Sequence, residues 1–291
     1  MSPQPQAIPI ATIAPPSTSD VPTAKLIELF SAIQGEGANC GTRQIFVRFA
    51  FCDLRCHYCD SAHTWTAPDT CAIEATPGQR DFETHPNPVK LDRLLDWVDR
   101  QNRPRLHDSI SITGGEPLLH AAFLKTFLPQ VKQRTGLPTY LETGGHRPEL
   151  LDGVIDHLDT IGMDVKLPSS SGEERWAAHE AFLRRCVEAN CDGGTAKVFV
   201  KTIVSAATTD DEIAQLGAMV SAIDPQLAVF LQPVTPLDPD LRDRNQTIRP
   251  DPYQHQLAPT PQQVLNWQTQ LKQQLDDVRV IPQTHKMLGQ L

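Results

Sequence analysis

The feature that most constrains the fold of this chain is the regular alternation of short apolar strands with amphipathic helices. Alternating or continuous apolar patterns predict strands at 25–33, 44–50, 109–113, 138–142, 160–166, 196–204, 227–232 and 278–281. Apolar residues at helical spacing predict helices near 91–98, 123–131, 149–157, 173–190, 210–223 and 260–275. Strands that alternate with helices pair in parallel, and six such units are typical of a partial barrel. We therefore expect an α/β fold, a partial (βα)6 TIM-like barrel.

The length and composition indicate one globular domain. The chain has 291 residues, of which 40% are hydrophobic and 21% charged, enough for one sizeable core. Residues 1–24 are rich in Pro, Ser, Thr and Ala, so we expect a disordered leader there. The single domain is then expected to span 25–291. Residues 66–88 lack periodicity, which predicts an inserted loop beside the site described next.

Three closely spaced cysteines predict a metal site directly after the strand at 44–50. Cys52, Cys56 and Cys59 have the spacing C-x3-C-x2-C, which lets one short loop surround a metal centre. In a four-iron cluster three thiolates leave one iron open, and that iron could hold a small molecule. With His57 and His63 nearby, the same residues could instead form a structural zinc site.

Polar and glycine-rich groups follow the predicted strands at their carboxyl ends. These groups are Arg48 with the cysteine loop, the GGEP turn at 114–117, Glu142 with a glycine pair, Asp164 with Lys166, and residues 232–235. The carboxyl ends of parallel strands meet at one rim, where ligands bind. In the turn, glycines allow close approach and Glu116 offers an acceptor for an ammonium group. A zinc site would need none of these groups, so the rim favours the cluster.

Two features have simpler alternatives. Arg48 is the one charged residue in an apolar strand, and it could bind an anion, face solvent or pair with a carboxylate. The IQGEG stretch at 33–37 could approach a ligand or form a hairpin turn.

Charge and cysteine content exclude several classes of function. With 26 Lys and Arg against 35 Asp and Glu, the net charge of −9 disfavours direct binding of nucleic acid, so we expect a small-molecule substrate. No apolar run reaches the ~18–20 residues of a membrane span, and the N-terminal residues lack a basic region followed by an apolar core. The seven cysteines show no disulfide pattern, and Cys186 and Cys191 fit helix packing. A cytoplasmic protein is expected.

The cysteine loop and the glycine-rich turn together resemble the radical S-adenosylmethionine superfamily. Four further stretches are similar to the 7-carboxy-7-deazaguanine synthase family: IQGEG at 33–37, FVR at 46–48, CDSAHTW at 59–65 and PQTHK at 282–286. The resemblance spans residues 26–291. It implies a [4Fe-4S] cluster, S-adenosylmethionine and Mg²⁺ as cofactors. It also implies conversion of 6-carboxy-5,6,7,8-tetrahydropterin to 7-carboxy-7-deazaguanine with loss of ammonia, in queuosine and deazapurine biosynthesis.

The resemblance assigns roles at matching positions. The cluster ligands would be Cys52, Cys56 and Cys59, and the magnesium ligand Ser61. Contacts to the pterin would come from Ile33, Gln34, Gly35, Arg48, Thr113 and the terminal carboxylate of Leu291. Contacts to S-adenosylmethionine would come from Tyr58, Asp60, Gly115, Glu116, Glu142, Asp164, Val165, Lys166, Gln232, Pro233, Val234 and Thr235. An electron donor such as flavodoxin or ferredoxin and a homodimer are also implied.

Two positions depart from the family pattern. Ser61 stands where many members have Thr, and its simpler role would be to cap the turn after Cys59. Phe51 stands where the family usually has Gly. This difference puts in doubt whether the backbone before Cys52 follows the family's path. Two other functions compete with the synthase: an activase that makes a glycyl radical on a partner protein, and a zinc or iron–sulfur scaffold for protein binding.

Overall fold

The structure is a computed structural model that describes residues 21–191, 196–235 and 257–290. Its described strands are β1 (Thr23–Ala24), β2 (Leu26–Ile33), β3 (Arg43–Phe49), β4 (Thr70–Glu74), β5 (Phe82–Pro86), β6 (Val89–Lys90), β7 (Ser109–Gly114), β8 (Thr139–Thr143), β9 (Thr160–Asp164), β10 (Lys197–Val204), β11 (Val229–Pro233) and β12 (Val278–Val280). Its α-helices are α1 (Leu91–Gln101), α2 (Ala121–Thr135), α3 (Pro148–Leu151), α4 (Pro168–Ser171), α5 (Trp176–Cys191), α6 (Asp210–Ser221), α7 (Pro261–Leu271) and α8 (Thr284–Met287). Four 3₁₀ turns are η1 (Gly37–Asn39), η2 (Ala62–Trp65), η3 (Pro117–His120) and η4 (Ile155–His157).

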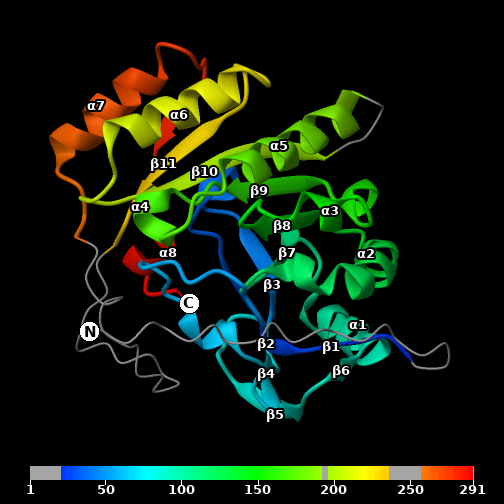
Figure 1. Ribbon diagram of the computed structural model, residues 1–291. Helices are drawn as coiled ribbons and strands as arrows, with labels where there is room; N and C mark the ends of the chain where they lie inside the picture. Colours follow the sequence, from blue (N-terminus) through cyan, green and yellow to red (C-terminus); the bar gives the residue numbers. More distant parts are fainter. Residues whose placement is uncertain (1–20, 192–195, 236–256, 291) are drawn as a thin grey trace, which may run out of the picture.

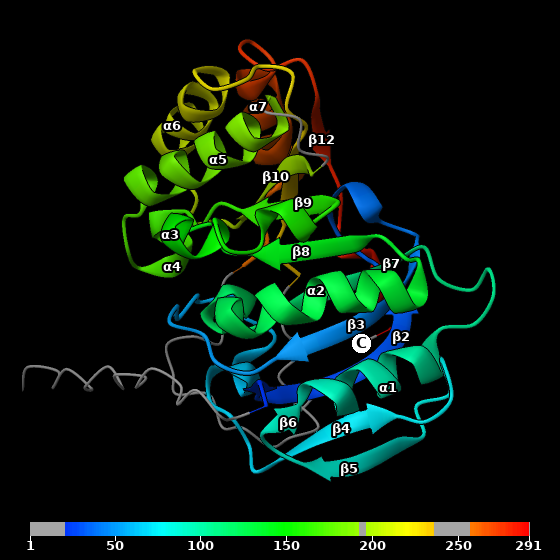
Figure 2. The same ribbon diagram turned by 90° about the vertical axis from the view of Figure 1, so that its right-hand side faces the viewer.

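One large sheet organises the molecule (Figure 1). Its strand order is β12-β11-β10-β9-β8-β7-β3-β2-β4-β5. Neighbouring strands from β3 to β12 in this order are parallel, whereas β2 is antiparallel to β3. Figure 2 shows this succession from β12 at the top to the β4–β5 hairpin at the bottom. The predicted α/β partial barrel is confirmed.

The two faces of the sheet differ because successive side chains of a strand point to opposite sides. One face carries Val and Ile residues that pack against helices α1, α2, α5, α6 and α7 in one large core. The other face holds two small aromatic clusters, Phe30 with Phe46, and Tyr140 with Phe199 and Phe230. Above these clusters, toward the carboxyl ends of the strands, the same face becomes polar. The face of the sheet that the helices cover is therefore apolar, and the face toward the barrel interior is partly polar.

Helix ends follow ordinary capping chemistry. Thr209 and Glu212 form a capping box at the start of α6, and Thr260 and Gln263 form another at the start of α7. Gly136 ends α2 with φ 69°, a left-handed conformation that favours glycine.

Three predictions about organisation need correction. Residues 21–24 are not part of a disordered leader, since β1 pairs with β6; residues 1–20 lie outside the described residues. Residues 66–88 are not simply a loop, because β4 and β5 form an antiparallel hairpin that extends the sheet beside β2. The helix expected at 149–157 is broken into α3 and η4.

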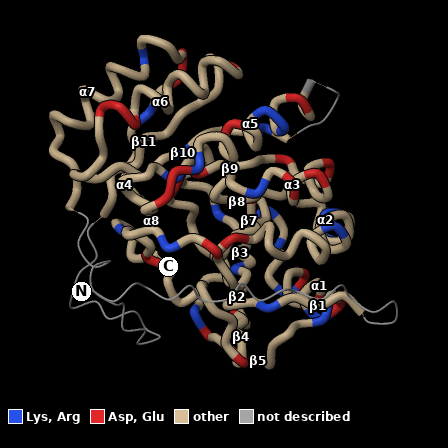
Figure 3. Tube along the Cα trace, viewed as in Figure 1, with Lys and Arg blue, Asp and Glu red and all other residues tan. Residues whose placement is uncertain are grey.

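Charged residues of both signs are spread over the molecule. Figure 3 shows Lys and Arg interspersed with Asp and Glu along the chain. Within the described ranges, every helix is too short or too polar to span a bilayer.

Candidate active site

A cavity of about 370 Å³ lies at the carboxyl ends of the parallel strands. Every second residue of a strand faces it, as with Tyr140 and Glu142 of β8 or Lys201 and Ile203 of β10. Fourteen of the predicted site residues line it: Gln34, Arg48, Cys52, Cys56, Tyr58, Cys59, Asp60, Ser61, Thr113, Gly115, Glu116, Glu142, Asp164 and Lys166. The cysteine loop and the carboxyl ends of β3, β7, β8 and β9 therefore share one cavity, whereas residues 232–235 do not line it.

The other eight predicted residues either do not line the cavity or lie outside the described residues. Ile33, Gly35, Val165, Gln232, Pro233, Val234 and Thr235 are absent from the described lining. Leu291 lies outside the described residues. Gln232 still reaches the site indirectly, because its Nε2 donates to Glu36 Oε1 at 2.8 Å.

The three cysteines of the loop all open onto the cavity. Burial raises the pKa of Cys52 to about 12 and that of Cys59 to about 11, and it also raises the pKa of Cys56. A metal must therefore displace protons from these thiols when it binds. Among the described residues, no group of three or more His, Cys, Asp and Glu surrounds one metal position. The three thiols nevertheless line one shared cavity, an arrangement that fits a cluster held by three thiolates.

Phe51 keeps a backbone path suited to glycine. Its φ is 74°, in the left-handed region, and its ring is 37% exposed and stacks on His120 with centroids 6.1 Å apart. Its carbonyl accepts a hydrogen bond of 2.8 Å from Glu116 N. A Cβ on Gly115 would collide with that carbonyl. Phe51 therefore adopts a backbone conformation that favours glycine.

Glu116 fastens the glycine-rich turn to β8. Its carboxylate is 1% exposed and accepts hydrogen bonds from Leu118 N at 3.1 Å, Thr143 Oγ1 at 2.9 Å and Gly144 N at 2.9 Å. These three donors hold Glu116 before any ammonium group arrives. The structure therefore shows an organising role that the sequence did not predict.

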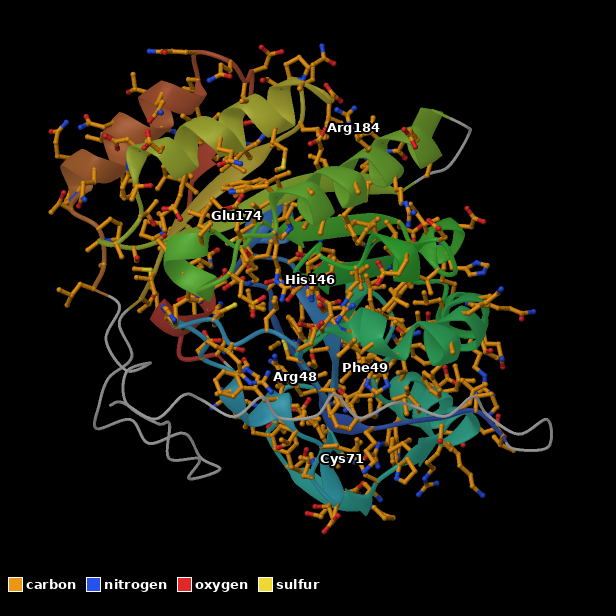
Figure 4. The ribbon with its side chains drawn as sticks, viewed as in Figure 1. Arg48, Phe49, Cys71, His146, Glu174 and Arg184 are labelled. Atoms are coloured by element: carbon orange, nitrogen blue, oxygen red, sulfur yellow. The ribbon has the colours of Figure 1, made fainter. Side chains whose placement is uncertain are left out.

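A link between the cysteine loop and the segment that follows β8 was missed entirely. The fully buried His146 places Nε2 2.9 Å from Asp53 Oδ1, and Arg147 Nε donates to Asp53 Oδ2 at 2.9 Å. Burial raises the pKa of Asp53, but His146 and Arg147 outweigh it and hold the pKa below its usual value. In Figure 4, His146 and Arg48 lie near the middle of the molecule, while Arg184 lies on the outer helices.

Arg48 pairs with a carboxylate of its own chain. Its Nε lies 2.7 Å from Glu28 Oε1, and its guanidinium lies 5.6 Å from the Phe30 ring centroid. Burial lowers the pKa of Arg48, but Glu28 outweighs burial and raises it. Beside it, Glu142 accepts from Gln34 Nε2 at 2.5 Å and from Thr113 Oγ1 at 2.9 Å.

Lysines and carboxylates face one another across the cavity. Asp164 Oδ2 lies 2.9 Å from Lys166 Nζ and 3.1 Å from Lys201 Nζ. Lys166 Nζ also donates to Tyr58 Oη at 3.0 Å, and Lys201 pairs with Glu36. The second oxygen of Asp164 is buried and has no partner among the described residues. It is thus available as an acceptor for a ligand.

Ser61 is not a side-chain cap. Its Oγ donates to Asp60 Oδ1 at 3.2 Å, while its carbonyl accepts from Thr64 N at 2.9 Å. The 3₁₀ turn η2 has no side-chain hydrogen bond at its N-cap. The capping alternative is therefore wrong for this hydroxyl, which lines the cavity with Asp60.

Lys201, Gln283, His285 and Lys286 are among the lining residues that had no predicted role. Lys201 could have been found, because a charged residue in the middle of a largely apolar strand is the same signal that identified Arg48. The other three belong to the PQTHK stretch at 282–286, which was recognised as similar to the family without a role for these residues.

Comparison with known proteins gives consistent matches. Residues 46–216, more than half of the chain, match the family model of the Radical SAM superfamily. A 7-carboxy-7-deazaguanine synthase of Geobacter sulfurreducens is 40% identical over 273 residues, covering 93% of this chain and 99% of that protein. One from Thermococcus kodakarensis is 31% identical, covering 73% and 85%. The crystal structure of QueE from Escherichia coli, 20% identical, covers 73% of this chain and 85% of its own with a TM-score of 0.50.

Proposed function

Since this chain belongs to the radical SAM superfamily and, within it, to the 7-carboxy-7-deazaguanine synthase family, we propose that it converts 6-carboxy-5,6,7,8-tetrahydropterin to 7-carboxy-7-deazaguanine with loss of ammonia. The reaction depends on a [4Fe-4S] cluster, S-adenosylmethionine and a reductant, and its product leads to queuosine and related deazapurines. The observation that carries the proposal is the shared cavity. It collects the three thiols of the loop together with Gln34, Arg48 and Thr113.

The residues present fit the cluster and its cofactor. Cys52, Cys56 and Cys59 would hold the cluster. When bound, the cluster and S-adenosylmethionine supply the radical that takes hydrogen from the substrate. Tyr58, Asp164 and Lys166 line the same cavity as the thiols, and the Asp164 oxygen that has no partner among the described residues suits a donor group of the cofactor.

The substrate side of the cavity suits a carboxylated, nitrogen-rich ring. Glu28 accepts from Nε of Arg48, and within the described part of the chain the other N–H donors of the guanidinium would serve a substrate carboxylate. Glu142 accepts from both Gln34 and Thr113 and so holds these two side chains in place. The chain's main contribution is thus to bind and orient the pterin.

We also propose that Ser61 helps to bind Mg²⁺. Its hydroxyl and the neighbouring Asp60 carboxylate are hard oxygen donors that line the cavity. Such a sparse set binds the ion weakly alone, so substrate oxygens would complete the site.

Further aspects of the proposal concern the surroundings of the enzyme. A flavodoxin or ferredoxin would supply electrons, and the active form would be a homodimer. The cytoplasm would be the compartment, because thiols that bind a cluster require reducing conditions, and the described cysteines are all unpaired.

Anaerobic reconstitution with iron and sulfide tests the proposal. Absorption and electron paramagnetic resonance, with and without S-adenosylmethionine, should reveal a cluster that binds the cofactor. With pterin and reductant, the enzyme should release 5′-deoxyadenosine and 7-carboxy-7-deazaguanine. Cys56→Ala should lose both products, whereas Cys71→Ala, a buried cysteine on β4, should keep them.

Two outcomes would contradict the proposal. A colourless zinc protein would leave the scaffold function standing. Cofactor cleavage without conversion of the pterin would favour an activase or another substrate.

A further inference from the structure

The segment 282–290 folds back over the cavity from the far end of the chain. Four of its side chains line the cavity: Gln283, His285, Lys286 and Gln290. Its outer side chains, such as Met287 with 76% exposure, face solvent. The segment contains only the short helix α8 and lacks a core of its own, so contacts with other elements must hold it.

These contacts reach two loops that also line the cavity. On the loop after β2, Gly35 O accepts from Thr284 N at 3.0 Å, and Glu36 Oε1 accepts from Gln283 Nε2 at 2.9 Å. On the cysteine loop, Asp60 Oδ2 lies 2.7 Å from Lys286 Nζ. A Cβ on Gly35 would collide with His285, so the backbones approach as closely as a glycine permits.

Glu36 is the point where these contacts meet the interior of the barrel. Its carboxylate also accepts from Gln232 Nε2 at 2.8 Å and pairs with Lys201. Lys201 stands in the middle of β10, and its side chain is 14% exposed. Burial raises the pKa of Glu36, but the charges of Lys201 and His285 lower it to about 2. Glu36 is therefore ionised at neutral pH, which makes its bond to Gln283 charge-assisted.

Lys201 is itself fixed at its other side. Asp164 lies opposite it in the parallel register of β9 and β10, and Asp164 Oδ2 is 3.1 Å from Nζ. A buried ammonium is tolerated only when paired, so two carboxylates confine Lys201. A continuous series of side-chain contacts thus runs from Asp164 through Lys201 and Glu36 to Gln283. It joins the barrel to the C-terminal segment.

We propose that Lys201 and Glu36 are positioning residues that hold the segment 282–290 closed over the active-site cavity. Only the effect on pterin binding rests on the proposed function. The contacts that hold the segment 282–290 over the cavity are made by the chain itself. The segment would cover bound substrate and keep water from it. Loss of either residue would loosen the segment without touching the thiols.

Hydrogen–deuterium exchange of the cluster-loaded full chain measures closure directly. In Lys201→Met and Glu36→Gln, amides in peptides covering 282–290 should exchange at least tenfold faster than in the wild type. Lys197→Met is the matched control, since Lys197 lies on the same strand but is exposed, and its exchange should stay at the wild-type rate. Wild-type protection in both Lys201→Met and Glu36→Gln overturns the proposal. If Lys201→Met does not fold, Glu36→Gln alone decides, because it keeps the size of the side chain.

Binding of the pterin separates positioning from direct contact. Glu36→Gln and Gln283→Leu should each raise the Kd for the pterin by about tenfold, with the Kd for S-adenosylmethionine unchanged. The double variant should raise it no further, because both changes break the same link. Multiplied effects in the double variant would overturn the positioning role and make Glu36 a direct ligand. If the wild type cleaves the cofactor but does not bind the pterin, the proposed substrate is wrong and the exchange result still stands.

Discussion

Replacing Phe51 by Gly and by Ala should reverse the usual stability order of these two residues. In regular structure Gly is less stable than Ala by ~0.5–1 kcal/mol, because it loses more freedom on folding. At Phe51 the φ of 74° lies in the left-handed region, which costs a residue with a Cβ roughly 1–2 kcal/mol. Both variants lose the ring that stacks on His120, so that loss cancels between them.

The stabilities of Phe51→Gly and Phe51→Ala should therefore differ only through the free-energy cost of the backbone conformation at this position. Phe51→Gly should be more stable than Phe51→Ala by about 1 kcal/mol, the left-handed cost after the entropy of Gly is subtracted. For a chain of this size the melting temperatures should differ by ~2 °C.

Urea unfolding of the cluster-free protein under anaerobic conditions provides the measurement, with equal m-values required of both variants. The same pair at Phe82, in the extended strand β5, serves as the control and should show the ordinary order. Equal stability of the two Phe51 variants, or a more stable Ala, would refute the claim that strain is stored at this position.

Three further results should follow from the site. Arg48→Ala should weaken pterin binding by about 2–5 kcal/mol, the scale for breaking a buried charged pair, and leave S-adenosylmethionine binding unchanged; an unaltered KM would make Arg48 purely structural. Ser61→Ala should raise the magnesium concentration for half-maximal turnover several-fold with full iron content, and Ser61→Thr should be tolerated; equal half-saturation in the wild type and Ser61→Ala would exclude the ligand role. His179 accepts from Lys166 N at 3.2 Å and faces Gly145 O at 3.0 Å, so the fold accommodates its neutral form. Burial lowers its pKa from 6.5 to about 4. As the pH falls below 6.5, the unfolded chain protonates His179 before the folded chain does, so the free energy of unfolding should decrease between pH 6.5 and pH 4. His179→Gln should reduce this pH dependence, measured by urea unfolding at a series of pH values. An unchanged slope would contradict this account.

The rim of the active site was predictable because it follows from local patterns. Apolar strands identify themselves by periodicity, and the rule for parallel sheets then brings Arg48, Glu142 and Asp164 to one edge. Segments of about ten residues are long enough to show this apolar periodicity.

What could not be predicted depends on contacts between distant residues. Asp53 meets His146 across 93 positions, and Cys40 meets Thr284 across 244. The hairpin of β4 and β5 was missed because Pro and Thr around Thr70–Glu74 masked a short alternating strand that pairs with β2. Glu116 was identified, but its three donors could be recognised only once β8 and η3 were placed side by side.

The contact between Gly35 and Thr284 also sets an order of events during synthesis on the ribosome. The β2 loop and the cysteine loop emerge early, while the segment that covers them is translated after the remaining strands of the barrel. Loop closure over so many residues is slow compared with the pairing of neighbouring elements. The cysteine loop is therefore synthesised long before residues 282–290, and the cavity can be covered only after that late segment has been made.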